Sequence, residues 1–235
     1  MANLKINKEE FFARVENDQS LANLDLSGLS FSGLHLHGRD LTGSVFYLTH
    51  FENCDFNGAD LSAVNMRRAF FNKCNLSATR MVRVEASGAI IKESQIMESD
   101  LSRAIMRQVH LDHTTAEKCL MVETDLQQAL ISASNLGGST LQKALLSFSI
   151  LEQCLAANVD FTEADLSCAD LNGADLSHSV FNRASLMLTN LSHTLLEGCQ
   201  FDKAILIGTV MAGVDPGRVN LSAAFTDSLV WKEED

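Results

Sequence analysis

The chain has 235 residues, enough for one or two domains. Its hydrophobic fraction of 46% and charged fraction of 20% are those of a folded protein and exclude an intrinsically disordered chain. The formal net charge of −12 and the pI near 4.9 disfavour direct binding to nucleic-acid phosphates or to an anionic membrane surface, and favour a basic partner.

The first twenty residues predict a cap. Residues 1–12 hold several charged side chains and no apolar run long enough for a signal peptide or a membrane span, so residence in a bacterial cytoplasm is expected. Secretion as an effector would leave no physical signature here and stays open. Asn7 followed by Glu10 is typical of a capping box, which predicts a short helix over residues 8–17 that covers the start of the domain.

A five-residue period follows and extends through residue 221. Every residue from Leu21 to Met211 whose number ends in 1 or 6 is Leu, Phe, Met or Ile, with three exceptions. Two positions earlier, no side chain between Ser44 and Val219 is larger than Val. The position between these two is often Asp or Asn. The three exceptions are Ala86, Ala116 and Ala156.

A period of five fits neither an α-helix, with 3.6 residues per turn, nor a strand, with a period of two. One large and one small inward side chain per unit require the chain to turn a corner after each unit, so four units close a square coil. Successive coils then stack at about 4.8 Å, the usual strand spacing. Two interior columns are predicted to hold stacked rings: Phe31, Phe51 and Phe71 in one, and Phe161, Phe181 and Phe201 in the other.

This pattern resembles the pentapeptide-repeat family, as the units Ala164-Asp165-Leu166-Ser167-Cys168 and Ala169-Asp170-Leu171-Asn172-Gly173 show. The resemblance implies an all-β fold, a right-handed quadrilateral parallel β-helix of about ten coils. The expected divisions are an N-terminal cap with a short helix (1–20), an uninterrupted β-helix (21–221), and a C-terminal cap or dimerisation tail (222–235).

The C-terminal tail departs from the repeat. Pro216 occupies a central position that calls for a large apolar residue, so regular coiling is expected to falter there. Members of the family often dimerise through this end, which implies a homodimer contact, and a simple monomeric cap is the alternative. The candidate contact residues are apolar: Leu221, Phe225, Leu229 and Trp231.

No residue pattern points to catalysis. Five of the six cysteines occupy the small inward position, Cys168 falls at a corner, and no Cys or His spacing matches a metal site. Many acids stand where the repeat itself calls for Asp or Asn, and a smooth rod offers no cleft that would shift their pKa values. The chain is therefore expected not to be an enzyme and to need no cofactor or metal.

Charge is distributed unevenly along the repeat. Residues 66–110 carry eight Lys and Arg against four Asp and Glu, whereas residues 111–214 carry four against twelve. Arginines recur in adjacent columns and predict a basic band, which is either an ordinary solvated face or a docking patch for an acidic partner or phosphate. The candidate partner-binding residues are Arg67, Arg83, Arg103, Arg107, Asp160 and Glu163.

Two functions are compatible with these observations. One is a non-catalytic interaction module or scaffold that binds a protein partner along a flat face. The other follows from the resemblance, because the Qnr and mycobacterial fluoroquinolone-resistance types of the family resemble B-form DNA and bind the type II topoisomerases DNA gyrase and topoisomerase IV. This chain would then modulate such an enzyme or protect it from quinolones. The basic band and the absence of an inserted loop weigh against mimicry.

Overall fold

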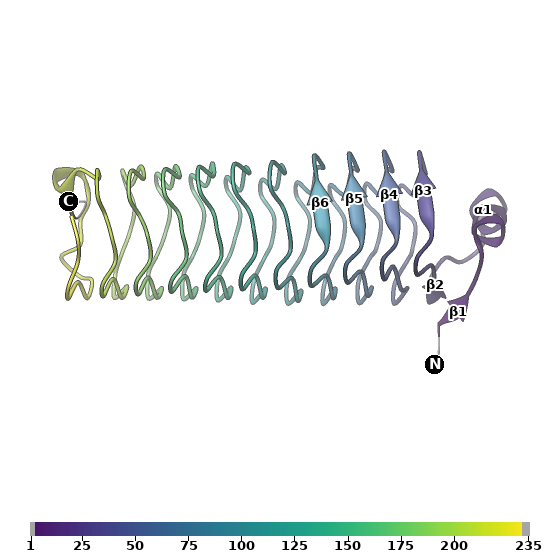
Figure 1. Cartoon of the computed structure of the whole chain (residues 1–235), viewed down its shortest axis with the longest axis horizontal. Coiled ribbons are helices and arrows are strands. Elements are labelled where there is room, and N and C mark those ends of the chain that lie inside the picture. Colours follow the sequence, from purple (N-terminus) through teal and green to yellow (C-terminus); the bar gives the residue numbers. More distant parts are fainter. Residues whose placement is uncertain (1–2, 232–235) are drawn as a thin grey trace.

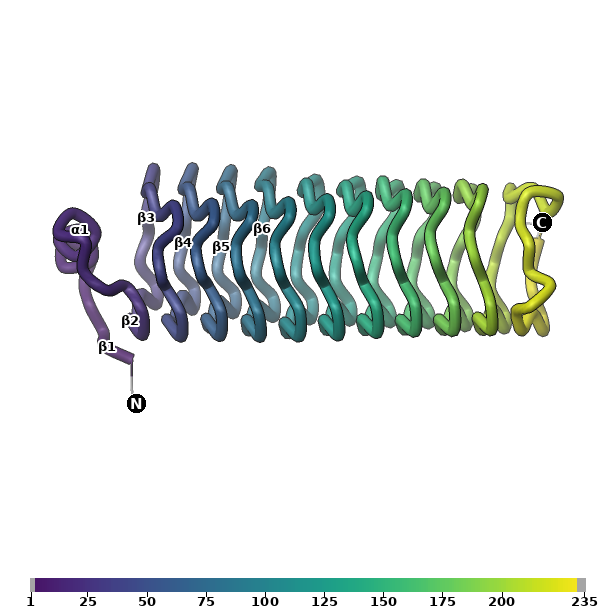
Figure 2. The backbone as a smooth tube through the Cα atoms, turned by 180° about the vertical axis from the view of Figure 1, so that it is seen from behind, coloured from purple at the N-terminus to yellow at the C-terminus, as the bar shows by residue number. Residues whose placement is uncertain are grey.

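The computed structural model describes residues 3–231. Figures 1 and 2 show a straight rod of evenly stacked coils, with a helix at one end. The short strand β1 (Leu4–Lys5) and the helix α1 (Lys8–Glu16) precede the rod, and β1 pairs in parallel with β2 (Leu24–Asp25) in the first coil. In this part of the chain, no helix has the length and apolar character needed to cross a membrane.

The rod has four sides. Parallel bridges join residues 20 positions apart in four columns, which confirms the predicted quadrilateral parallel β-helix. We name each face by its first bridged residue, so that face 1 starts at Asp25, face 2 at Ser30, face 3 at His35 and face 4 at Asp40. Each face therefore repeats every 20 residues, with one coil per repeat.

Face 2 carries the longest strands. Its first four coils contain β3 (Ser30–Ser32), β4 (His50–Glu52), β5 (Phe70–Asn72) and β6 (Ile90–Lys92), which form one parallel sheet in that order. Beyond β6, neighbouring coils on this face are joined by single β-bridges, as they are on the other three faces.

The corners explain the polar part of the repeat. The N–H of Val64 donates to the carbonyl of Leu61 at 3.1 Å, and the intervening Ala63 has a φ of +56°, as a type II turn requires at its third residue. One carboxylate oxygen of Asp60 accepts the N–H of Ser62 at 2.9 Å. The same bond recurs along the rod, so Asp or Asn before each centre stabilises the corner that follows.

The interior is closed and its polar groups are satisfied. Every large central residue from Leu21 to Met211 is buried. Most hydroxyl and thiol groups at the small inward position donate to carbonyls of the previous coil, as Ser134 does to Leu111 at 2.6 Å and Cys154 to Ile131 at 2.8 Å. These bonds join neighbouring coils inside an otherwise apolar core.

The two predicted columns of rings are confirmed. Phe31 and Phe51 stack with ring centroids 5.6 Å apart, and Phe51 and Phe71 with centroids 5.0 Å apart. Farther along the rod, the distances are 4.9 Å from Phe161 to Phe181 and 5.1 Å from Phe181 to Phe201. Their interplanar angles of 7° and 6° are those of parallel stacking.

The N-terminal helix forms as predicted. The side chain of Asn7 accepts the N–H of Glu10, and the Glu10 carboxylate accepts the N–H of Asn7, which completes the capping box. Phe11 is fully buried, with its ring 5.0 Å from that of Phe31. The helix thus covers the core at the first coil (Figure 1).

The C-terminal coil is irregular but not unpaired. Pro216 begins the short helix η1 (Pro216–Arg218), and the bridge column of face 3 stops at Leu195. The ladder then resumes on face 1, where Ile205 pairs with Phe225, and on face 2, where Val210 pairs with Val230. Coiling therefore falters at Pro216 as expected, but continues past residue 221 because the chain returns to register. Three of the four candidate contact residues pack half-buried against the core: Leu221, Leu229 and Trp231.

Candidate functional site

Arginines of the predicted basic band lie on two adjacent faces. Arg103 on face 4 donates to Glu123 at 2.9 Å, and Arg107 on face 1 donates to Asp125 at 2.6 Å. Within residues 3–231, the side chains of Arg67 and Arg83 form no ion pair. Two of the four candidate arginines are therefore neutralised by acids of the next coil, and the other two keep a free positive charge.

Arg83 borders an open hollow on face 4. Its neighbour Arg80 pairs with Asp60 at 3.4 Å across one coil, which leaves Arg83 as the arginine of the hollow without an acidic partner among the described residues. Because the hollow is open and its three arginines are exposed, an anion held there would remain in contact with water. The other lining residues are Val82, Asp100, Ser102, Arg103 and Val122.

The two candidate acids lie elsewhere, three coils beyond Arg103 on face 4. Asp160 accepts the N–H of Thr162 at 2.9 Å and the side-chain amide of Gln142 at 2.6 Å. Partial burial raises the pKa of Asp160, but these hydrogen bonds outweigh it and hold the pKa below its ordinary value.

Glu163 is likewise committed within the rod. It stands between Lys143, at 3.8 Å, and Arg183, at 3.4 Å, in a line of alternating charges along face 4. The structure thus does not bring Asp160 and Glu163 together with the arginines into one site. Both acids contribute to contacts between neighbouring coils.

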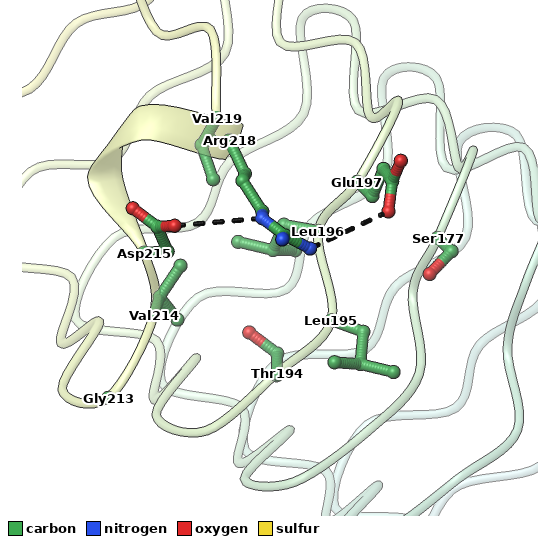
Figure 3. A pocket seen from close by; sticks show the side chains of 10 residues that line it. All are labelled: Ser177, Thr194, Leu195, Leu196, Glu197, Gly213, Val214, Asp215, Arg218 and Val219. Atoms are coloured by element: carbon green, nitrogen blue, oxygen red, sulfur yellow. Dashed lines mark ion pairs between the residues drawn. The ribbon is translucent and has the colours of Figure 1, made fainter.

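Figure 3 shows a pocket on face 3, where the bridge that would follow Leu195 is missing. Its volume of about 250 Å³ is small for a ligand site. Arg218 lies between Asp215, at 3.6 Å, and Glu197, at 4.0 Å, and all three side chains are largely exposed. The pocket follows from the displacement of the chain at Pro216, and its apolar walls are Leu195, Leu196, Val214 and Val219.

Two of the inward cysteines, Cys119 and Cys154, are not poised for nucleophilic chemistry, whereas a hydrogen bond with Cys74 lowers the pKa of the buried Cys54 to about 7. Burial raises the pKa of Cys119 to about 11 and that of Cys154 to about 12, so both remain protonated at neutral pH. Among residues 3–231, no group of three or more His, Cys, Asp and Glu is arranged to hold a metal ion.

Sequence reasoning missed a set of large apolar side chains that point outward on face 1. Leu188 is 64% exposed, Phe148 61% and Phe225 58%. Their signal is present in the sequence, because these residues occupy outward columns of face 1 where the repeat normally places small or polar residues. We call the members of this set in the C-terminal half the apolar surface, while Leu48 and Ile105, each 43% exposed, lie on the same face nearer the N-terminus. The apolar surface consists of Leu145, Phe148, Met187, Leu188 and Phe225.

Comparisons with known proteins agree with this architecture. The family model described as "Pentapeptide repeats" matches residues 44–92 and 146–224 with eight copies, which is more than half of the chain. A comparison with curated protein sequences gives no significant match.

Several solved structures are similar to this chain at low sequence identity. HetL, a pentapeptide repeat protein involved in heterocyst differentiation regulation in the cyanobacterium Nostoc, is 22% identical over 88% of this chain and 97% of its own, with a TM-score of 0.48. QnrB1, a plasmid-mediated fluoroquinolone resistance protein, is 21% identical over 85% of this chain and 92% of its own, with a TM-score of 0.38. These likenesses concern the fold alone. From the matched repeats and the four-sided coil, the chain belongs to the pentapeptide-repeat family.

Proposed function

We propose that this chain is a non-catalytic, rod-shaped interaction module that binds a macromolecular partner through the sides of its β-helix. The observation that carries the proposal is the apolar surface. Phe148 and Leu188 gain nothing from exposure to water, and burying such a side chain contributes about 1.5 to 3 kcal/mol. A cluster of such side chains on one face is typical of a surface that a partner covers.

The free arginines support the same proposal. Arg67 and Arg83 carry unpaired positive charge, within the described residues, on a chain whose net charge is −12. An acidic group of a partner would meet attraction at this band and repulsion over most of the remaining surface. Such a pattern selects the orientation and register of binding more than it adds affinity.

The proposal is tested by affinity capture with matched variants. Phe148→Glu combined with Leu188→Glu places two charges on the apolar surface, whereas Gln127→Glu adds a charge at an outward position of the same face. We expect the wild type and Gln127→Glu to retain the same protein, and the double variant to lose it. Retention by all three, or capture of no protein by the wild type, would contradict the proposal.

DNA mimicry is the second candidate, favoured by the excess of acids in residues 111–214. The partly neutralised basic band interrupts that negative surface, and the apolar surface has no counterpart on a phosphate backbone. A supercoiling assay with purified DNA gyrase, with and without quinolone, separates the two candidates. Inhibition or protection at micromolar protein would favour mimicry, and the absence of both would leave the interaction module.

A further inference from the structure

We propose that face 1 binds a second copy of this chain, laid antiparallel along the whole face. This inference rests on the proposed function, because it assigns an occupant to the surface on which that function depends. A twofold axis that crosses the face brings coils together in reverse order and keeps each column opposite itself. Since the columns repeat every 20 residues, only registers that differ by whole coils are available.

The area of the surface favours a partner as long as the rod. The apolar surface covers about five coils, or roughly 24 Å of rod at the usual strand spacing. A face five residues wide measures about 16 Å across, so this surface alone would bury roughly 800 Å² in both partners together, below the 1,200 to 2,000 Å² of a stable complex. The full face of about ten coils reaches that range. A second copy is a straight rod of matching length.

One register pairs the apolar side chains. In this register the twofold axis passes midway between the coil of residues 105–108 and the coil of residues 125–128. Leu48 of one copy then lies opposite Leu188 of the other copy, and Tyr47 lies opposite Met187. Leu48 is 43% exposed, although it lies in the N-terminal half of the rod. The coil of Met187 and Leu188, in the middle of the apolar surface, thus meets an aromatic and an apolar side chain of the second copy.

The same register sets a large side chain opposite a gap. Phe148 meets Gly88, whose φ of +66° places it at a corner without a side chain. A Cβ at Gly88 would have Arg68 Cγ, at 3.6 Å, as its nearest neighbour, so the stem of Arg68 borders the gap. A phenylalanine ring inserted there would lie beside that arginine, an arrangement in which cation and ring attract.

Charge selects this register over its neighbours. Arg67 and Arg68 meet the coil of Asp165, and within residues 3–231 none of these three side chains forms an ion pair. A shift by one coil in either direction would set Glu85 opposite Asp165 or Asp125. A parallel pair in register would set the coil of Arg67 and Arg68 against the same coil of the second copy. The antiparallel register avoids all of these repulsions.

The least favourable contact in this register provides a sensitive test of the proposed dimer. Glu85 lies opposite Leu145 in the chosen register, and its carboxylate caps the corner at Ser87. Glu85→Gln keeps a side-chain oxygen for that cap and removes the charge. We expect Glu85→Gln to tighten dimerisation by roughly threefold to tenfold, and Leu188→Glu to weaken it by at least tenfold, with unchanged far-UV circular dichroism for both.

Cross-linking tests the register. Arg68→Cys faces the native Cys168 of the other copy, and Cys168 is half-buried at a corner of face 1. With copper phenanthroline as oxidant, we expect a disulfide-linked dimer for Arg68→Cys, and none for Arg68→Cys combined with Cys168→Ser. Arg83→Cys, at the equivalent position of face 4, is the matched control and should stay unlinked.

Sedimentation of the full-length wild type decides the outcome. A dimer at micromolar concentration that Leu188→Glu dissociates supports the proposal. A wild type that stays monomeric at 100 µM, or a dimer that cross-links equally well through Arg83→Cys, would overturn it. A monomer that still captures a different protein through the apolar surface would leave the proposed function intact, so the two failures are distinguishable.

Discussion

The N-terminal and C-terminal halves of the rod place their large apolar residues differently. In the N-terminal half, the aromatic rings are inside, where Phe51 contacts the rings of Phe31, Phe46, Phe56 and Phe71, and α1 covers the end of the core. In the C-terminal half, Phe148, Leu188 and Phe225 point outward, and the last coil is irregular. Both halves keep a buried column of rings, so the difference teaches that the C-terminal half holds most of the exposed apolar side chains, to which the N-terminal half adds Leu48 on the same face.

The largest effect should come from the ring cluster. Phe51→Ala removes a fully buried ring that contacts four others, and should lower the free energy of unfolding by about 4 kcal/mol. Phe148→Ala removes an exposed ring and should change it by less than about 0.5 kcal/mol in the monomer. Urea denaturation followed by circular dichroism measures both, and equal effects would erase the distinction between the halves.

The caps of the two ends should differ nearly as much. Phe11→Ala uncovers the first coil, and is expected to cost about 3 kcal/mol because this side chain is fully buried. Phe225→Ala, in the last coil, removes a side chain that is 58% exposed and should cost much less. The melting temperatures of the two variants provide the comparison. A larger loss of stability for Phe225→Ala than for Phe11→Ala would contradict the expected order.

A smaller effect is expected at the capping box. Asn7→Ala leaves the N–H of Glu10 without its acceptor and should cost about 1 kcal/mol. Glu9→Ala, in the same first turn but outside the box, is the control and should change stability less. The free energy of unfolding measured in urea decides between them.

The smallest effect should appear with pH. Partial burial raises the pKa of Asp60 and of Asp160, but hydrogen bonds outweigh it and hold both pKa values below the ordinary 3.8. The unfolded chain therefore binds these protons more readily, so their contribution to stability is complete above about pH 4 and is lost as the pH falls further. Asp160→Asn should flatten the decline of melting temperature between pH 4 and pH 2, and an unchanged slope would contradict this cause.

The interior could be predicted from the sequence because packing restricts it. Each central position needs one large apolar side chain, so the period of five specified the coil, the ring columns and the position where Pro216 disturbs them. The neutralisation of Arg103 and Arg107 depends on acids of the next coil, and could have been found by looking 20 residues forward from Arg103 and 18 residues forward from Arg107. The bridge that Phe225 forms depends on how the last coil stacks on the coil before it. No short stretch of the sequence predicts it.

The role of the outward-facing residues could be predicted less well from the sequence than the interior. An exposed residue satisfies no packing rule, so Leu188 or Phe148 alone reads as an ordinary surface residue. The apolar surface emerges once the residues are sorted into faces, since members from coils far apart in sequence lie in neighbouring columns. Its occupant depends on a second molecule, which the folding of one chain does not specify.

One pair of variants tests the central claim, that a coil of 20 residues decides which side chains point inward. Leu126 is fully buried, and the adjacent Gln127 points outward. Leu126→Asp would bury an unpaired charge and should cost more than about 4 kcal/mol, whereas Gln127→Asp should stay within about 0.5 kcal/mol of the wild type. Thermal unfolding followed by far-UV circular dichroism should show a lost transition for the first and an unchanged one for the second. Equal tolerance at both positions, or a spectrum dominated by helix, would contradict the account.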